Sequence, residues 1–145
     1  MQSVRIEGLD KLVRRFHKLE RAYGVRGELL EKSLLNAARI AKRRVQAEAP
    51  IGQTGNLRRG VVAKKFNYQI NNRPAAFCAM DYKIAPHAHL VEYGTPDERH
   101  WRSGKSTGQM PANPFFKRGI LQAAPTVQRY LKSQIQEMLK RAVKR

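Results

Sequence analysis

The sequence VVAKKFNYQINNRPAAFCAMDY, at residues 61–82, contains two runs in which apolar side chains alternate with polar or small ones. The apolar positions of the first run are Val62, Phe66, Tyr68 and Ile70, with Lys64 as an exception. Those of the second run are Ala76, Cys78, Met80 and Tyr82. A period of two residues is typical of a half-buried strand, and the residues between the runs, Asn71–Pro74, favour a turn. We therefore predict an antiparallel hairpin over Val61–Tyr82 with a four-residue connection.

Two amphipathic helices are predicted before the hairpin. In the first, apolar residues recur at steps of three and four from Leu9 to Tyr23, after a short predicted strand at Ser3–Glu7. The second helix is predicted from about Glu28 to Ala47 and has small residues on its apolar face. Its last turns carry three cations, which the helix dipole favours at that end. These are Lys42, Arg43 and Arg44.

The chain after the hairpin is less regular. The short apolar stretch His87–Tyr93 fits either a strand or a helical turn, and the polar, glycine-containing residues 94–113 predict a flexible loop. Asn113-Pro114 has the cap and first-turn chemistry of a helix start. We predict a long C-terminal helix from there, with a kink or a fresh start at Pro125. The expected fold is α+β, with two N-terminal helices and a long C-terminal helix packed on a small antiparallel sheet in a single domain, residues 1–145.

Charge is the strongest signal in the composition. The 145 residues include 29 Lys and Arg against 11 Asp and Glu, for a net charge of +18. A surplus of this size exceeds what solubility requires and predicts a partner that supplies negative charge, although a solvated surface is the alternative. No run approaches the ~18 apolar residues of a membrane span, and Met1–Gly8 lacks the pattern of a secretion signal. We therefore expect assembly in a cytoplasm and no membrane partner.

Residues that could carry catalysis do not form a known pattern. Gly104-Lys105-Ser106-Thr107 resembles the end of a phosphate-binding loop, but Arg99 stands where that motif requires glycine. His87 and His89 would share one side of a strand and could hold a metal with Glu92 or His100, yet no third ligand stands at a recognisable spacing. Cys78, the single cysteine, fits a small buried residue. We predict no enzyme activity, metal or other cofactor, with a metal-dependent hydrolase as the weakest alternative.

Cationic helix faces are the candidate contacts with partner proteins or DNA. They comprise Lys11, Arg14, Arg15 and Lys18 on the first predicted helix and Lys42, Arg43 and Arg44 on the second. Trp101, between Arg99 and Arg102, is a candidate interface anchor because Trp and Arg are enriched at binding hot spots. Neither a helix-turn-helix nor an RNA-binding sheet is indicated. Nonspecific contact with phosphates remains open.

Several stretches, taken in order, resemble the tail-component family of long-tailed bacteriophages, which includes head-to-tail joining and tail-completion proteins. The N-terminal stretches are Gly8-Leu9-Asp10, Ala49-Pro50 and Thr54-Gly55-Asn56-Leu57-Arg58. The later ones are His89-Leu90-Val91-Glu92-Tyr93-Gly94-Thr95 and Pro111-Ala112-Asn113-Pro114-Phe115-Phe116. The likeness spans nearly the whole chain, and Glu-Tyr-Gly-Thr and Pro-Phe-Phe are its most specific parts. The following Lys117-Arg118-Gly119 and the large basic excess depart from it.

The resemblance implies a structural virion protein at the neck, where members form a ring, commonly of six subunits, around the DNA exit channel. Its partners would be further copies of itself, the adjacent head-connector and tail proteins, and packaged DNA through nonspecific contact. Candidate subunit contacts are Glu92, Tyr93, Arg99, Trp101, Phe115 and Phe116. The alternative function is a nonspecific nucleic-acid-binding basic protein. The residues leave open whether the basic face lines the channel or docks onto acidic proteins.

Overall fold

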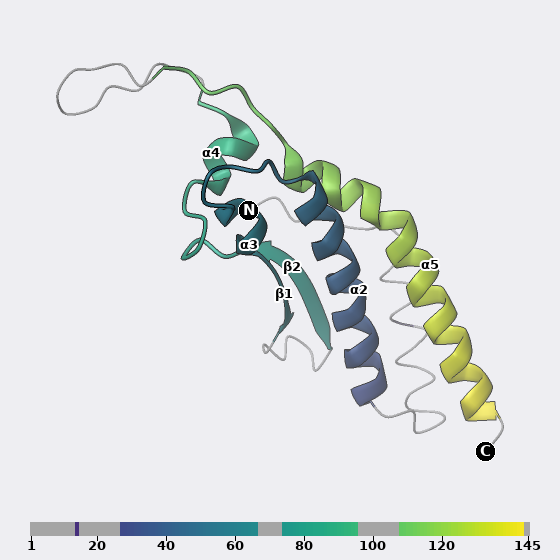
Figure 1. Cartoon of the computed structure of the whole chain (residues 1–145). Coiled ribbons are helices and arrows are strands. Elements are labelled where there is room, and N and C mark those ends of the chain that lie inside the picture. The colour runs from purple at the N-terminus through teal and green to yellow at the C-terminus, as the bar shows by residue number, and fades with distance from the viewer. Residues whose placement is uncertain (1–13, 15–26, 67–73, 96–107, 144–145) are drawn as a thin grey trace.

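The computed structural model describes residue 14 and residues 27–66, 74–95 and 108–143. The first helix and the strand predicted before it lie outside these residues, except for Arg14, which is helical and exposed. Figure 1 shows the described elements, which are α2 (Gly27–Glu48), α3 (Asn56–Gly60), β1 (Val61–Phe66), β2 (Ala75–Met80), α4 (Ala88–Tyr93) and α5 (Phe115–Val143). Helices packed with a two-stranded antiparallel sheet confirm the predicted α+β class.

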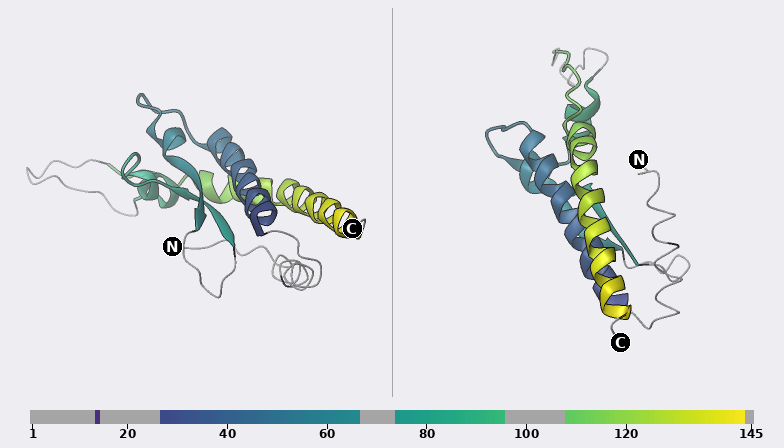
Figure 2. Two further views of the ribbon diagram at one scale, coloured as in Figure 1. Left: turned by 90° about the horizontal axis from the view of Figure 1, so that it is seen from below. Right: turned by 90° about the vertical axis from the view of Figure 1, so that its right-hand side faces the viewer.

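The long helices α2 and α5 lie side by side and run in opposite directions (Figures 1 and 2). Leu30, near the start of α2, is buried against Met138, near the end of α5. At the other end, Val45 of α2 belongs to the same buried cluster as Phe115 of α5. Apolar residues at steps of three and four give each helix one buried side, which is the pattern that the sequence predicted.

The C-terminal end of α2 lies within one residue of the prediction, but its last turn lacks the expected cations. The helix ends at Glu48, its last turn contains no basic residue, and Lys42, Arg43 and Arg44 lie in the turn before it. Their positions therefore do not complement the dipole at the helix terminus. The contacts of these three residues therefore depend on the side of the helix on which each one lies.

The hairpin is present, but the face of β1 that packs against α2 was predicted wrongly. Val61 is opposite Met80 in the register, and both belong to the cluster beneath α2. Since side chains alternate along a strand, Ala63 and Lys65 share this face, whereas Val62 and Phe66 lie on the other. Lys65 accordingly reaches Glu31 of α2, with 2.9 Å between Nζ and Oε2.

Apolar residues on both faces of the hairpin explain this error. Phe66, 42% exposed, meets Phe77 edge-on at a centroid distance of 5.7 Å on the face away from α2. The alternation that starts at Val62 and Phe66 therefore identified the wrong side of β1 as the buried one. Lys64 seemed an exception on that side, but the side is exposed and a lysine there is ordinary. In β2 the predicted face is confirmed, because Cys78 and Met80 pack against the core. Residues 67–73, with most of the predicted turn, lie outside the described part.

The main core lies where the end of α2, the start of β1 and the start of α5 meet. Its fully buried large side chains are Val45, Val61 and Phe115. Within α4, Ala88 adds a further buried side chain, so His87–Tyr93 contributes a helical turn and not a strand. Across the described residues, the structure contains no helix with the length and apolarity that crossing a bilayer demands.

The helix α5 begins directly after Asn113-Pro114, as predicted, and continues to Val143. Pro125 lies inside this helix, so the predicted alternative of a fresh start is wrong. Proline removes a single backbone N–H donor, and the buried residues on either side of it, Ala123 and Val127, pack in the same cluster with Ala37 of α2. The parts of α5 before and after Pro125 therefore pack against the same side of α2.

Candidate functional site

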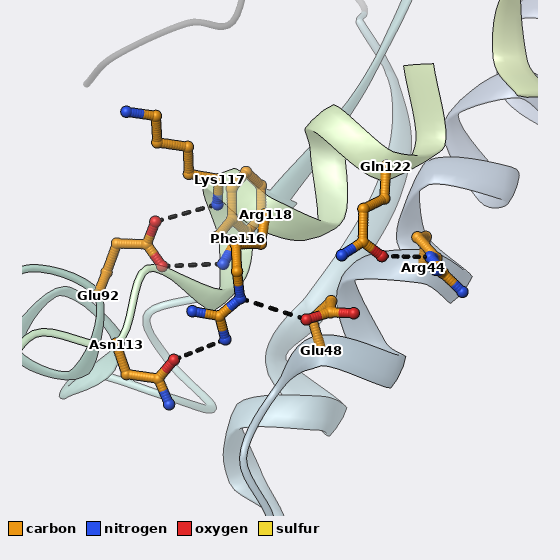
Figure 3. Close-up of polar contacts among 8 residues, drawn as sticks. All are labelled: Arg44, Glu48, Glu92, Asn113, Phe116, Lys117, Arg118 and Gln122. Carbon is orange, nitrogen blue, oxygen red and sulfur yellow. Dashed lines mark hydrogen bonds and ion pairs between the residues drawn. The ribbon is translucent and has the colours of Figure 1, made fainter. Parts of the chain in front are cut away.

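Glu92 of α4 caps the N-terminus of α5. One carboxylate oxygen accepts a hydrogen bond from the backbone N–H of Phe116 at 2.9 Å, and the other accepts one from that of Lys117 at 3.0 Å (Figure 3). The first N–H groups of a helix have no partner within the helix, and the helix dipole favours negative charge there. A half-buried carboxylate from a segment more than twenty residues earlier supplies both needs, and it ties α4 to α5.

Backbone hydrogen bonds join the same two segments at a second place. The N–H of Thr95 donates to the carbonyl of Met110 at 2.9 Å, and the N–H of Met110 donates to the Thr95 hydroxyl at 2.8 Å. The N–H of Asn113 donates to the carbonyl of Val91 at 2.8 Å. We call residues 91–95 together with residues 110–117 the clasp. It fixes both ends of the predicted 94–113 loop.

Gly94 is required by the close approach of the two halves of the clasp. Its φ is 72°, in the left-handed region that glycine adopts without steric cost. A Cβ at this position would lie 2.7 Å from both the backbone nitrogen of Ala112 and the carbonyl oxygen of Met110. The Glu-Tyr-Gly-Thr and Pro-Phe-Phe stretches, which carry the most specific resemblance in the sequence, are thus physical partners.

Arg118 connects the clasp to the end of α2. Its guanidinium donates to Asn113 Oδ1 at 2.7 Å and forms an ion pair with Glu48 at 3.3 Å (Figure 3). The next residue, Gly119, lies so close to α2 that a Cβ would be 2.5 Å from the Cα of Val45. The Lys117-Arg118-Gly119 departure from the family pattern therefore contributes an ion pair and a close helix contact to this fold.

The predicted subunit contacts divide between interior and surface. Phe115 is 0% exposed in the core, so its side chain is not accessible to a neighbouring subunit in this conformation. Glu92 and Phe116 are partly buried within the clasp. Tyr93 is 64% exposed and free to meet another molecule. Arg99 and Trp101 lie outside the described residues.

The predicted cationic contacts also separate. Lys11, Arg15 and Lys18 lie outside the described part, and Lys42 is partly buried on the side of α2 that faces β2. Arg43 and Arg44 are exposed, and Arg44 donates to Gln122 of α5 at 2.8 Å (Figure 3). Lys42 and Arg44 are two residues apart and so point about 200° apart around the helix, which means that the three cations do not share one face.

Exposed cations lie on both long helices, and the sequence argument named only Arg43 and Arg44 among them. Six of these side chains, three from each helix, lie on the solvent-exposed sides of the pair, and we call them together the helix-pair face. They are Arg39, Arg43, Arg44, Arg129, Lys132 and Lys140. The cations of α5 occur at helical spacing among the polar residues between its buried positions, and this pattern could have revealed them from the sequence.

The groups considered for chemistry have ordinary structural surroundings. Burial raises the pKa of the Cys78 thiol to about 11, partly opposed by the charge of Lys42, so the sulfur is protonated and unreactive at neutral pH. His87 precedes α4 and His89 lies within it, so the strand that would place both imidazoles on one side is not formed. Among the residues with described positions, no three His, Cys, Asp or Glu side chains gather as a metal site would need.

The family model described as "Bacteriophage HK97-gp10, putative tail-component" matches residues 10–94, more than half of the chain. The chain therefore belongs to this family of bacteriophage tail components and is a structural protein of a phage particle. The match ends within the first half of the clasp, at Gly94. No curated protein and no solved structure matches the chain.

Proposed function

We propose that this protein is a tail-completion or head–tail connector subunit, which forms an oligomeric ring around the DNA exit channel at the neck of the phage. The observation that carries the proposal is the unbalanced charge of a protein in a tail-component family. With 29 basic and 11 acidic residues per chain, further copies cannot neutralise one another. A ring of such subunits needs an acidic neighbour, and the neck supplies both DNA and adjoining rings.

Contact between subunits is assigned to the exposed side of the clasp. Tyr93 and Met110 are 64% and 41% exposed on segments that backbone hydrogen bonds hold together. Large apolar side chains on a fixed backbone suit a protein contact, because little conformational entropy is lost on binding. A ring requires a head-to-tail contact between two different surfaces, so these side chains would meet a different part of the next subunit. The proposal includes a single domain, assembly in the host bacterial cytoplasm and a final location in the virion.

Electron microscopy of the purified protein, alone and mixed with phage tails, tests this proposal. We expect annular particles, or monomers that close into rings on the tails. Tyr93→Ala should abolish the rings while leaving the melting temperature unchanged, and Tyr82→Ala, which removes another half-exposed tyrosine, is the control. Tails that gain no density from the wild-type protein would reject the neck assignment.

The alternative, a nonspecific nucleic-acid-binding protein outside the particle, predicts a different pair of results. Such a protein would bind random duplex strongly, with an affinity that falls steeply with salt, and would not assemble on tails. Truncation before Asn113 cannot distinguish these functions, because it removes Phe115, Ala123, Val127 and Leu131 from the core. Point substitutions on exposed positions are therefore the appropriate tools.

A further inference from the structure

One side of α5 carries exposed residues at steps of three and four along the helix. Such steps keep to the same side, because each residue turns the helix by about 100°. This side is opposite to the one that contacts α2. Arg129 is two residues from both Val127 and Leu131, which are buried in the cluster shared with α2, and so points about 200° away from each of them. We call this side the outer stripe of α5, and its members are Pro125, Arg129, Lys132, Gln136 and Lys140, all of them exposed.

The outer stripe lies at the edge of the described fold. α2 packs against both the hairpin and α5, and α5 forms one edge of the described elements in Figure 1. The right-hand view of Figure 2 shows α5 in front of α2, with no described element over the near side of α5. The stripe is therefore accessible along its length, with the rest of the described fold behind it.

The positive charge of the outer stripe is not neutralised within the described part of the chain. Glu137 is the single acidic residue of α5, and it pairs with Arg141 at 3.9 Å. Arg129, Lys132 and Lys140 form no ion pair with a described residue. These three cations are therefore available to a ligand.

The side chains of the stripe distinguish between types of anionic partner. A protein interface normally has an apolar or aromatic centre, whereas nucleic-acid interfaces are polar and strongly positive. The one large apolar side chain of α5 among the exposed ones, Leu121, lies a turn before Pro125, so the stripe itself contains none. The Gln136 amide adds a hydrogen-bond donor of the kind that contacts phosphate oxygens. A second copy of the chain is a poor occupant because it too carries +18.

We propose that the outer stripe of α5 faces the DNA channel of the ring and contacts the phosphate backbone of the duplex there, without reading its sequence. At 1.5 Å per residue, Arg129 and Lys140 are about 16 Å apart along α5. Each strand of a duplex carries one charge about every 3.4 Å along its axis, so this length spans several phosphates. Arginine and lysine contacts to phosphates position a protein on DNA but carry no sequence information. The inference deepens the proposed neck function and rests on it for the channel and its DNA.

The first test compares two triple variants of the full chain, each of which loses one arginine and two lysines. The stripe variant is Arg129→Gln with Lys132→Gln and Lys140→Gln. The control, Arg43→Gln with Lys83→Gln and Lys117→Gln, removes exposed cations from α2, the turn after β2 and another side of α5. Binding of a fluorescent random-sequence duplex is measured by anisotropy across a series of salt concentrations, with poly-glutamate as a second probe. Melting temperature and assembly on tails are measured for both variants.

The stripe variant should lose at least about tenfold in affinity for the duplex near 0.1 M salt, and its slope of log K against log salt should fall by about 3. Its melting temperature and its assembly on tails should match those of the wild type, and the control should stay close to the wild type throughout. Equal losses in both variants would mean that net charge alone attracts DNA, which overturns the proposal. So would a loss confined to poly-glutamate, since the stripe would then serve an acidic protein, or a loss of assembly on tails, since the stripe would then be a subunit contact.

The second test asks whether the stripe meets DNA inside the particle. A photo-crosslinking residue is introduced as Gln136→p-benzoylphenylalanine, with Lys83→p-benzoylphenylalanine as the control, and assembled particles are irradiated. Packaged DNA should be crosslinked from position 136 and not from position 83. Crosslinks from position 136 to protein alone would overturn the proposal and leave the neck function standing. Wild-type protein that adds no density to tails would instead reject the neck function, so the two failures are distinguishable.

Discussion

The clasp and the helix-pair face use their polar groups in opposite ways. In the clasp, the Glu92 carboxylate is bonded to the first turn of α5, and beside the clasp the Arg118 guanidinium is bonded to Asn113 and Glu48 of the same chain. On the helix-pair face, cations such as Arg43 and Arg129 extend into solvent with no carboxylate partner among the described residues. The most distinctive sequence stretches therefore build the structure, and less conspicuous polar positions are the ones available to a partner.

This difference separates stability from binding. A change in the clasp or in the core beneath it should unfold the protein at lower temperature or denaturant concentration, because it breaks internal contacts. A change on the helix-pair face should leave the folded state almost as stable, because exposed charges contribute little. The following substitutions test that division.

Phe115→Ala should have the largest effect. The side chain is 0% exposed in the main core, and loss of a buried phenylalanine costs about 3–5 kcal/mol through lost burial and the cavity left behind. Urea unfolding followed by circular dichroism measures it. Leu121→Ala, at a position 55% exposed, is the control and should change little. Stability unaffected in Phe115→Ala would restore this residue as a candidate subunit contact.

Gly119→Ala should destabilise the protein by about 1–3 kcal/mol, the usual cost of overpacking. Alanine is the better helix former by about 1 kcal/mol, so a net loss would show that the contact with Val45 outweighs helix propensity. Gly52→Ala is the control, because nothing lies within 4 Å of a Cβ there. Thermal and urea unfolding of both variants measure the difference; a more stable Gly119→Ala would contradict the close packing of α2 and α5.

Glu92→Ala should cost about 1–2 kcal/mol, in the range for loss of a helix cap. Two backbone N–H groups lose their acceptor, and the dipole of α5 loses its counter-charge. Glu92→Gln should fall between this variant and the wild type, because an amide oxygen can still accept a bond. Glu137→Ala removes an exposed carboxylate and is the control. Faster amide hydrogen exchange at Phe116 and Lys117 would locate the loss at the clasp.

Arg43→Gln combined with Arg129→Gln should have the smallest effect on stability, within about 0.5 kcal/mol in either direction. Both side chains are exposed, and neither has an ion pair to lose within the described structure. The melting temperature should therefore match that of the wild type. A marked fall would reveal a structural role for these cations and would remove the contrast with the clasp.

The sequence predicted the elements better than their contacts. Helical spacing located α2 and most of α5, and Asn113-Pro114 located the start of α5 within two residues. The family was also predicted, from the order of short stretches, and the match over residues 10–94 confirms it. These signals are local, or depend only on order along the chain, so a single sequence contains them.

Contacts between distant segments could not be obtained in this way. Nothing local to Glu92 states that its carboxylate meets the N–H groups of Phe116 and Lys117, because the pairing depends on how α4 and α5 are placed. Phe115 was likewise predicted to be a subunit contact because it belongs to the Pro-Phe-Phe stretch, and the sequence does not show that its side chain is buried. The buried face of β1 was predicted wrongly for a related reason. Apolar residues occur on both faces of the strand, Val61 and Ala63 on one and Val62 and Phe66 on the other, so alternation alone did not identify the buried face.

The approach of Gly119 to Val45 also has a mechanical consequence. Gly119 allows α5 to pack against α2 in one register only. If α5 slid by one turn, Phe115 or Ala123 would take the place of Gly119 beside Val45, where a Cβ has no room. A force applied to one end of the molecule would then be transmitted to the other end without a change in the register of the two helices.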